Sequence, residues 1–121
     1  MVRDTYSEQI CRFAFTRAQA EALVAAANQA DVERLHDSRA AHAAQELKIK
    51  LEASKSKGLG PVGVALPLED AMAFVFAIEH VWMTGEDFDD ARAYWALEVK
   101  ATQRKAKEAL FKHSLQQLRA A

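Results

Sequence analysis

The chain has 121 residues, with 16 Lys and Arg against 17 Asp and Glu, a formal net charge of −1 and one cysteine. This length suits one hydrophobic core, so we expect a single domain over residues 1–121. One cysteine excludes an internal disulfide, and the balanced charge gives no reason to expect nucleic acid or acidic lipid as a partner. The start of the chain has no signal-peptide pattern, and no apolar run approaches the roughly 20 residues of a membrane span. We therefore expect a cytoplasmic protein without a membrane partner.

A short strand followed by a helix is expected near the start of the chain. In Cys11–Phe15 the bulkier apolar side chains occupy every second position, which is typical of a half-buried strand. Thr16 and Gln19 then match a capping box, in which each side chain bonds the backbone N–H of the other residue. A first helix should therefore run from here to about residue 28.

The middle of the chain predicts a second helix and a loop. The helix should start at Asp31 or Ser38 and end near Lys55, because its alanines and leucines repeat at the spacing of one buried helix face. Residues 54–66 contain glycine, proline and serine, and are expected to form a flexible loop. An alternative for residues 62–66 is a second short strand, which could pair with the first strand.

A third helix, from Pro67 to Met83, carries more apolar surface than one face needs. Most of its large apolar residues share one wide arc that suits the core, whereas Met72, Phe76 and Met83 fall on a second strip. Two interpretations stay open. Either this helix is buried on both sides, or the second strip binds a partner, since Met and Phe are common at adaptable interfaces.

A fourth helix should begin near residue 86 and continue to the end of the chain. The stretch Phe88–Arg119 has no Gly or Pro and would be roughly 48 Å long as a helix. A compact chain of this length has a radius of gyration near ~14 Å, so one end should project beyond the domain. Three apolar residues near that end lie further round the helix than the core stripe, and should face a second protomer or another protein: Phe111, Leu115 and Leu118.

Charge is segregated along the chain although the total is close to zero. Residues 1–57 carry +1 (9 basic, 8 acidic), residues 58–98 carry −7 (1 basic, 8 acidic) and residues 99–121 carry +5 (6 basic, 1 acidic). Acidic residues at the start of a helix and basic residues at its end match the helix dipole, which is one explanation. The other is antiparallel pairing of two fourth helices that cross near Lys100, so that each acidic half meets a basic half.

Motifs typical of enzymes and metal sites are incomplete. Residues 58–63 fit the letters G-x-G-x-x-G, but they follow a helix, whereas a dinucleotide loop follows a strand and opens a helix. Residues 33–36 match half of a di-iron motif that has no second copy. An enzyme would need Glu69, Glu79 and His80 to converge in one pocket. We therefore expect no catalytic residues, no metal and no cofactor.

Nucleic-acid binding is the alternative function. Lys100, Arg104 and Lys107 share one helix face and could follow a phosphate backbone. The first strand with the two helices after it, residues 9 to about 54, resembles the ribbon-helix-helix DNA-binding family at the level of pattern. That resemblance implies a dimer that lays paired strands in the major groove, where Arg12 would be the outward residue able to read a base edge.

The sequence therefore predicts a mainly α-helical single domain. It should be a bundle of about four helices with a short N-terminal strand, which can form a minimal two-stranded ribbon, and a long C-terminal helix. We expect a non-enzymatic protein–protein interaction module, acting as an adaptor, an inhibitor of a larger complex or an assembly factor, and forming a homodimer through the fourth helix. The expected partner-binding residues form two sets: Met72, Phe76 and Met83; Phe111, Leu115 and Leu118.

Overall fold

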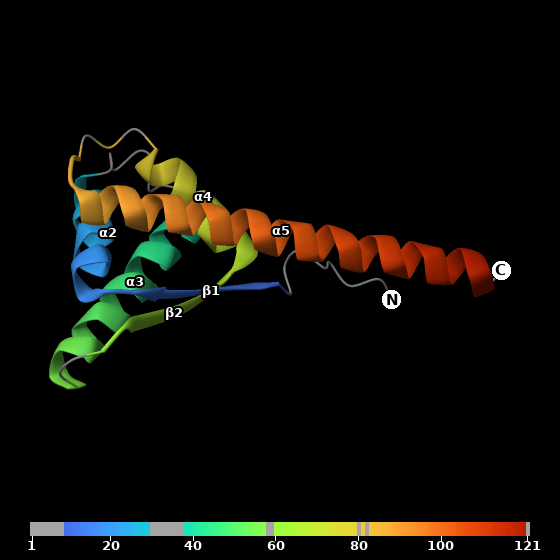
Figure 1. Cartoon of the computed structure of the whole chain (residues 1–121), viewed down its shortest axis with the longest axis horizontal. Helices are drawn as coiled ribbons and strands as arrows, with labels where there is room; N and C mark the ends of the chain where they lie inside the picture. Colours follow the sequence, from blue (N-terminus) through green and yellow to red (C-terminus); the bar gives the residue numbers. More distant parts are fainter. Residues whose placement is uncertain (1–8, 30–37, 58–59, 80, 82, 121) are drawn as a thin grey trace.

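The structure, a computed structural model, describes residues 9–29, 38–57, 60–79, 81 and 83–120. Two strands and four helices follow one another in these residues (Figure 1): β1 Ile10–Phe15, α2 Arg17–Gln29, α3 Ser38–Lys57, β2 Val62–Pro67, α4 Leu68–Ile78 and α5 Glu86–Ala120. The predicted fold, mainly α-helical with a small N-terminal ribbon and a long C-terminal helix, is confirmed.

The two strands form an antiparallel pair in which Phe13 lies opposite Val64. The expected first strand is confirmed, and so is its pairing with a second strand. Alternate side chains of β1 are buried, at Cys11, Phe13 and Phe15, because successive side chains of a strand point to opposite faces. β2 alternates in the same way, so one face of the ribbon belongs to the core and the other is exposed.

The buried face of the ribbon meets the helices at Trp95 of α5, which is fully buried. The Trp95 indole stacks on the Phe13 ring with the ring centroids 4.2 Å apart, and it lies 4.6 Å from the ring of Phe74 in α4. Its Nε1–H donates to the carbonyl oxygen of Ala71 (2.9 Å), which satisfies the only polar atom of the indole. One side chain thus joins β1, α4 and α5.

The predicted capping box at the start of α2 is confirmed. The Gln19 N–H donates to Thr16 Oγ1 (3.1 Å), and the Thr16 N–H donates to Gln19 Oε1 (3.0 Å). These bonds satisfy backbone donors that a helix start would otherwise leave unpaired. They fix the corner at which the chain leaves the sheet and enters the helical layer.

Two predicted boundaries differ from the structure. The loop expected at 54–66 is shorter, because α3 and β2 extend into it from either side. The third helix was expected to reach Met83, but α4 ends at Ile78. Beyond it, the Val81 N–H donates to the Ile78 carbonyl (3.3 Å) and the Met83 N–H to the Val81 carbonyl (3.1 Å), in turns tighter than those of an α-helix. The apolar pattern continues past the helix because Val81 and Met83 still pack against the core from this irregular segment.

The last helix is long compared with the domain it packs on (Figure 1). At 1.5 Å per residue, the 35 residues of α5 extend about 52 Å. Ala106 is the last buried residue that the structure describes, and residues 107–119 are exposed apart from the half-buried Leu110. The C-terminal part of α5 therefore extends beyond the other described elements, as its length predicted.

Candidate functional site

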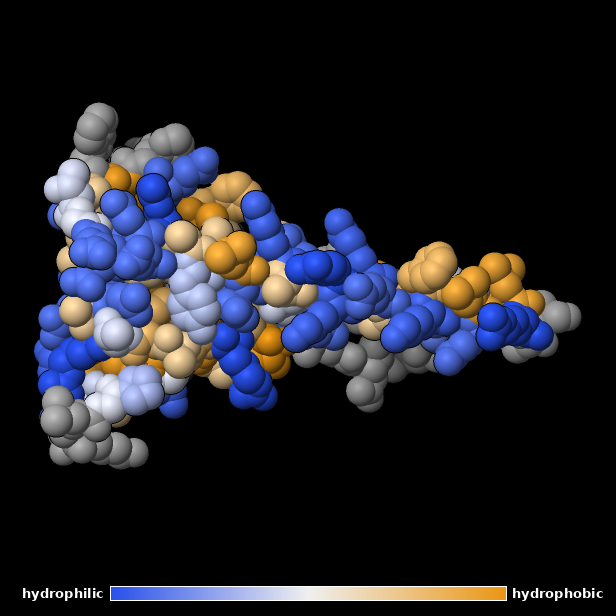
Figure 2. All heavy atoms as spheres, viewed as in Figure 1, coloured by the Kyte–Doolittle hydropathy of each residue, from blue (hydrophilic) through white to orange (hydrophobic). Residues whose placement is uncertain are grey.

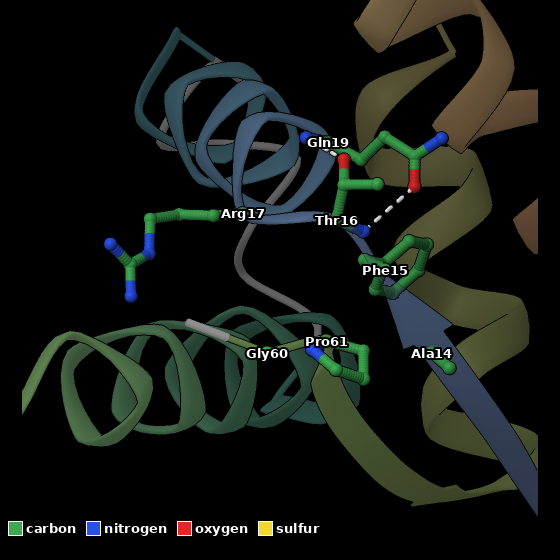
Figure 3. Close-up of a pocket in the computed structure, with 7 residues that line it drawn as sticks. All are labelled: Ala14, Phe15, Thr16, Arg17, Gln19, Gly60 and Pro61. Atoms are coloured by element: carbon green, nitrogen blue, oxygen red, sulfur yellow. Dashed lines mark hydrogen bonds between the residues drawn. The ribbon is translucent and has the colours of Figure 1, made fainter. Parts of the chain in front are cut away.

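A hollow of about 480 Å³ lies where β1 turns into α2, beside the start of β2 (Figure 3). Its polar side chains already have partners within the fold. Thr16 and Gln19 bond each other in the capping box, and Arg17 Nη2 donates to the Ser54 carbonyl (3.1 Å). Figure 3 shows the Arg17 side chain pointing away from the other two. The polar groups of this hollow thus serve the helix start and the contact with α3.

Two pairs of titratable side chains join α3 to α4. His42 Nδ1 and Asp70 Oδ2 lie 2.5 Å apart, and Arg39 on the preceding turn of α3 pairs with Glu69 (3.0 Å). The Asp70 side chain is mostly buried, whereas that of His42 is half exposed. In the part of the chain that the structure describes, no group of three or more His, Cys, Asp or Glu side chains could hold a metal ion. No local sequence pattern indicates the contact of His42 with Asp70, because the two residues are 28 positions apart.

The groups that an enzyme would need do not gather in one place. Glu69 lies in the first turn of α4 and pairs with Arg39, whereas Glu79 caps the opposite end of that helix. The third expected group, His80, lies outside the described residues. The half motif at 33–36 and the alternative helix start at Asp31 lie outside them as well.

The first predicted partner set is divided by the structure. Phe76 is 67% exposed, and it forms the rim of two adjoining hollows of about 250 and 220 Å³ between α4 and α5. Met72 lines the second hollow, where its sulfur accepts a hydrogen bond from Gln103 Nε2 (3.4 Å). Met83 instead lies between the two helices in sequence and packs against the core as a partly buried residue. The strip predicted from periodicity is thus a shallow groove with one strongly exposed aromatic ring.

The second predicted set lies together on the projecting end of α5. Phe111 is 64% exposed, Leu115 37% and Leu118 72%. On a helix that turns 100° per residue, these residues lie within about 40° of the direction opposite Trp95, so they point away from the core. Figure 2 shows apolar side chains gathered near the far end of this helix, with hydrophilic ones between them and the domain.

The same outward face continues back along the part of α5 that packs on the domain. Leu97 is 65% exposed and precedes Phe111 by two steps of seven residues, with Arg104 at the step between them. We name this face the outer stripe, and its residues recur at spacings of three and four: Leu97, Ala101, Arg104, Glu108, Phe111, Leu115 and Leu118. Sequence reasoning missed Leu97 because it lies in the half of the helix that supplies the core. The spacing of seven residues from Leu97 to Arg104 and from Arg104 to Phe111 is the sequence signal that could have identified Leu97.

The residues expected for nucleic acid are all exposed: Arg12, Lys100, Arg104 and Lys107. A ribbon-helix-helix dimer pairs its strand with the same strand of a second protomer. Here β1 pairs instead with β2 of its own chain. On the other edge of β1, the Ala14 N–H donates to the Tyr94 hydroxyl (3.1 Å). This pairing differs from the one that the resemblance implies, because the strand that pairs with β1 belongs to the same chain.

One titratable group is perturbed by the fold itself. Cys11 is fully buried on the inner face of β1, and burial raises the pKa of its thiol above the ordinary 9.0. The nearby Glu98 carboxylate raises this pKa as well, whereas a hydrogen bond with the Thr102 side chain lowers it. A thiol held in its protonated form is a poor nucleophile, so Cys11 acts as a small core residue.

None of the described helices combines the length and the apolar character that a membrane crossing requires. No protein-family model matches this chain, and neither a curated protein nor a solved structure is significantly similar to it.

Proposed function

We propose that this chain is a non-enzymatic protein–protein interaction module that forms a homodimer through the outer stripe of α5. The observation that carries the proposal is the exposure of Phe111 and Leu118 on a helix end that contributes no residue to the core cluster. Apolar side chains grouped on one exposed face lose free energy by leaving water, and such faces mark interaction sites. A partner that covers this face would bury large side chains that the domain leaves exposed.

Charge supports a second copy of the chain as that partner. The first turn of α5 carries Glu86, Asp87 and Asp89, whereas five of the six basic residues after position 98 lie in 100–112. One helix therefore offers an acidic half and a basic half. Two such helices are complementary when they run antiparallel, and a twofold arrangement uses the same surface on both protomers.

Light scattering tests the proposal with variants on one helix end. We expect the wild-type chain to approach twice its 13.4 kDa mass at high concentration. Phe111→Asp and Leu115→Asp should each weaken association by about tenfold or more, because they place a charge among apolar side chains that the contact would bury. Circular dichroism should show unchanged helix content, since both residues lie outside the core.

Ala109→Asp is the matched control for these two variants. It places the same side chain on the same projecting end, but on the side of the helix turned away from the outer stripe. Its association should equal that of the wild type. A wild-type chain that stays monomeric at every concentration would refute the homodimer, and equal loss in all three variants would show that helix stability, not the stripe, decides association.

Nucleic-acid binding is a second candidate, favoured by the exposure of three basic residues on one side of α5: Lys100, Arg104 and Lys107. A gel shift at low and at moderate salt tests it. Binding that disappears with salt and shows no sequence preference would indicate phosphate contacts alone. Binding that survives moderate salt and prefers one sequence would support a DNA-binding regulator.

A further inference from the structure

The backbone groups of β2 point alternately to the two edges of the strand, as they do in any antiparallel ladder. The Leu68 N–H donates to the Gln9 carbonyl on the β1 side (2.9 Å), in the same register as the ribbon. The even-numbered residues of β2 therefore bond β1. The N–H and C=O groups of Gly63 and Ala65 point to the opposite, outer edge of β2.

That outer edge has no hydrogen-bond partner in the part of the chain that the structure describes. Gly63 and Ala65 are exposed, and their N–H groups meet no acceptor there. The outer edge of β1 differs, because it lies against α5 and its Ala14 N–H donates to the Tyr94 hydroxyl (3.1 Å). In Figure 1, β1 lies between α5 and β2, so the free edge of β2 is turned away from α5. Free N–H and C=O groups at strand spacing are the groups with which an added strand pairs.

A hollow of about 330 Å³ borders the same part of β2 where the strand passes α3. Residues 63–65 line it, together with Arg12 and Phe13 of β1 and with two side chains of α3, Glu46 and Lys50. Among the described residues, nothing lies within 4 Å of the position that a Cβ would take at Gly63. An added segment therefore has room beside this stretch of β2.

The charge around the hollow is mainly positive. Arg12 and Lys50 are exposed, and neither forms an ion pair within the described residues, whereas Glu46 is the one acidic side chain of the lining and lies 4.0 Å from His42. Acidic side chains on the added segment complement the two cations. A second copy of β2 would instead bring Arg12 and Lys50 toward their own copies, which disfavours self-pairing.

We propose that the outer edge of β2 binds a short, extended peptide segment with acidic side chains, as a third strand of the sheet. The carbonyl groups of the segment accept from the N–H groups of Gly63 and Ala65, and its own N–H groups donate to their carbonyls. Pro61 and Pro67, on either side of these residues, have no N–H, so the pairing stays short and does not extend into open-ended strand addition. This surface lies in the ribbon and does not depend on the proposed homodimer through α5.

Amide chemical shifts of the isotopically labelled full chain test the proposal. The probe is an acetylated and amidated pentapeptide, Glu-Val-Glu-Val-Glu. We expect saturable shifts of the Gly63 and Ala65 amide signals, because their N–H groups gain acceptors. The Val64 signal should change less, because its N–H already bonds β1. The control peptide carries the same side chains but a methyl group on every backbone nitrogen, which removes its donors and blocks strand pairing, so its binding should be lost.

Two variants test the edge and the charge separately. Ala65→Pro removes one outward N–H without removing a hydrogen bond of the ribbon, and should weaken binding of the pentapeptide by about fivefold. Lys50→Glu should weaken it by about threefold. Lys48→Glu is the matched control, because it makes the same charge change on the same helix, two positions earlier and therefore on the opposite side, and it should leave the affinity unchanged. Circular dichroism checks that each variant is folded.

Each outcome either supports or overturns strand addition. Saturable shifts with the pentapeptide that the methylated peptide does not cause support it. Equal binding of the two peptides would show attraction by charge alone and would overturn it, as would the absence of shifts at millimolar pentapeptide. Equal weakening by Lys50→Glu and Lys48→Glu would overturn the acidic preference at this hollow. If the Gly63 and Ala65 signals changed with protein concentration alone, a second copy would occupy the edge, and the peptide proposal would be wrong.

Discussion

Trp95 shows how one residue determines the arrangement of three elements. Its ring stacks on Phe13 of β1 and contacts Phe74 of α4, while its Nε1–H bonds the Ala71 carbonyl. The stacking adds to the area that the indole buries, and the hydrogen bond fixes its orientation. Because α5 is anchored here by its inward face, the direction of its outward face is fixed as well. The outer stripe is thus positioned by a residue on the opposite side of the same helix.

Cys11 gives a prediction at the same scale. Its thiol pKa is raised chiefly by burial, so the folded chain keeps the thiol proton to a higher pH than the unfolded chain. Between these two pKa values unfolding releases a proton, and the free energy of unfolding therefore falls as pH rises. The stability that the protonated thiol contributes is fully present below the ordinary pKa of 9.0. It is lost as the pH rises through the higher pKa of the folded chain.

We expect urea denaturation of the wild type to show a steeper loss of stability as the pH rises above about 9 than Cys11→Ala shows. The variant keeps every lysine and tyrosine, so their titration cancels in the comparison. If the free energies of unfolding of the two chains changed in parallel with pH, the raised pKa would be contradicted. The loss of stability from the small cavity in Cys11→Ala does not affect this comparison, because it is the same at every pH.

At the scale of elements, the start of α2 gives a second prediction about stability. Thr16→Ala removes the hydroxyl that accepts from the Gln19 N–H, and loss of such a cap costs about 1 kcal/mol. Thr16→Ser keeps the oxygen and should retain most of that stability. Chemical denaturation of the three chains measures the difference. If the alanine and serine variants were equally destabilised, the methyl group of Thr16 and not its oxygen would be the stabilising part.

Patterns within a few residues predicted the helices and strands well. Contacts between residues far apart in the sequence were not predicted. The capping box at Thr16 and the alternation in β1 are each encoded within a few residues, and both are confirmed. The end of α4 was predicted too late, because apolar spacing reports burial and the segment after Ile78 is still partly buried. Contacts such as His42 with Asp70 depend on how helices pack, which periodicity along one helix does not contain.

Only part of the outer stripe was predicted from the sequence. Phe111, Leu115 and Leu118 stood out because they depart from the core stripe of their own helix. Leu97 belongs to the same face but sits among core residues, so only the burial of its neighbours reveals that it points outward. The sequence thus indicated which end carries exposed apolar residues, and the structure shows how far their face continues along α5.

For the whole molecule, the core residues and the exposed apolar residues of α5's projecting end lie in different parts of the chain. Every residue of the core cluster lies between Cys11 and Val99, whereas the exposed apolar residues of the projecting end lie after Ala106. A chain that ends at residue 106 should therefore keep the thermal midpoint of the full chain at low protein concentration. It should remain monomeric, because it lacks Phe111 and Leu115.

The full chain should behave differently as its concentration rises. Dimerisation stabilises the folded state by mass action, so the midpoint of the full chain should increase with protein concentration while that of the shortened chain stays constant. Differential scanning calorimetry over a hundredfold concentration range measures both. A lower midpoint for the shortened chain even at the lowest concentration would mean that residues 107–121 support their own domain, and the outer stripe would then not be a surface reserved for a second copy.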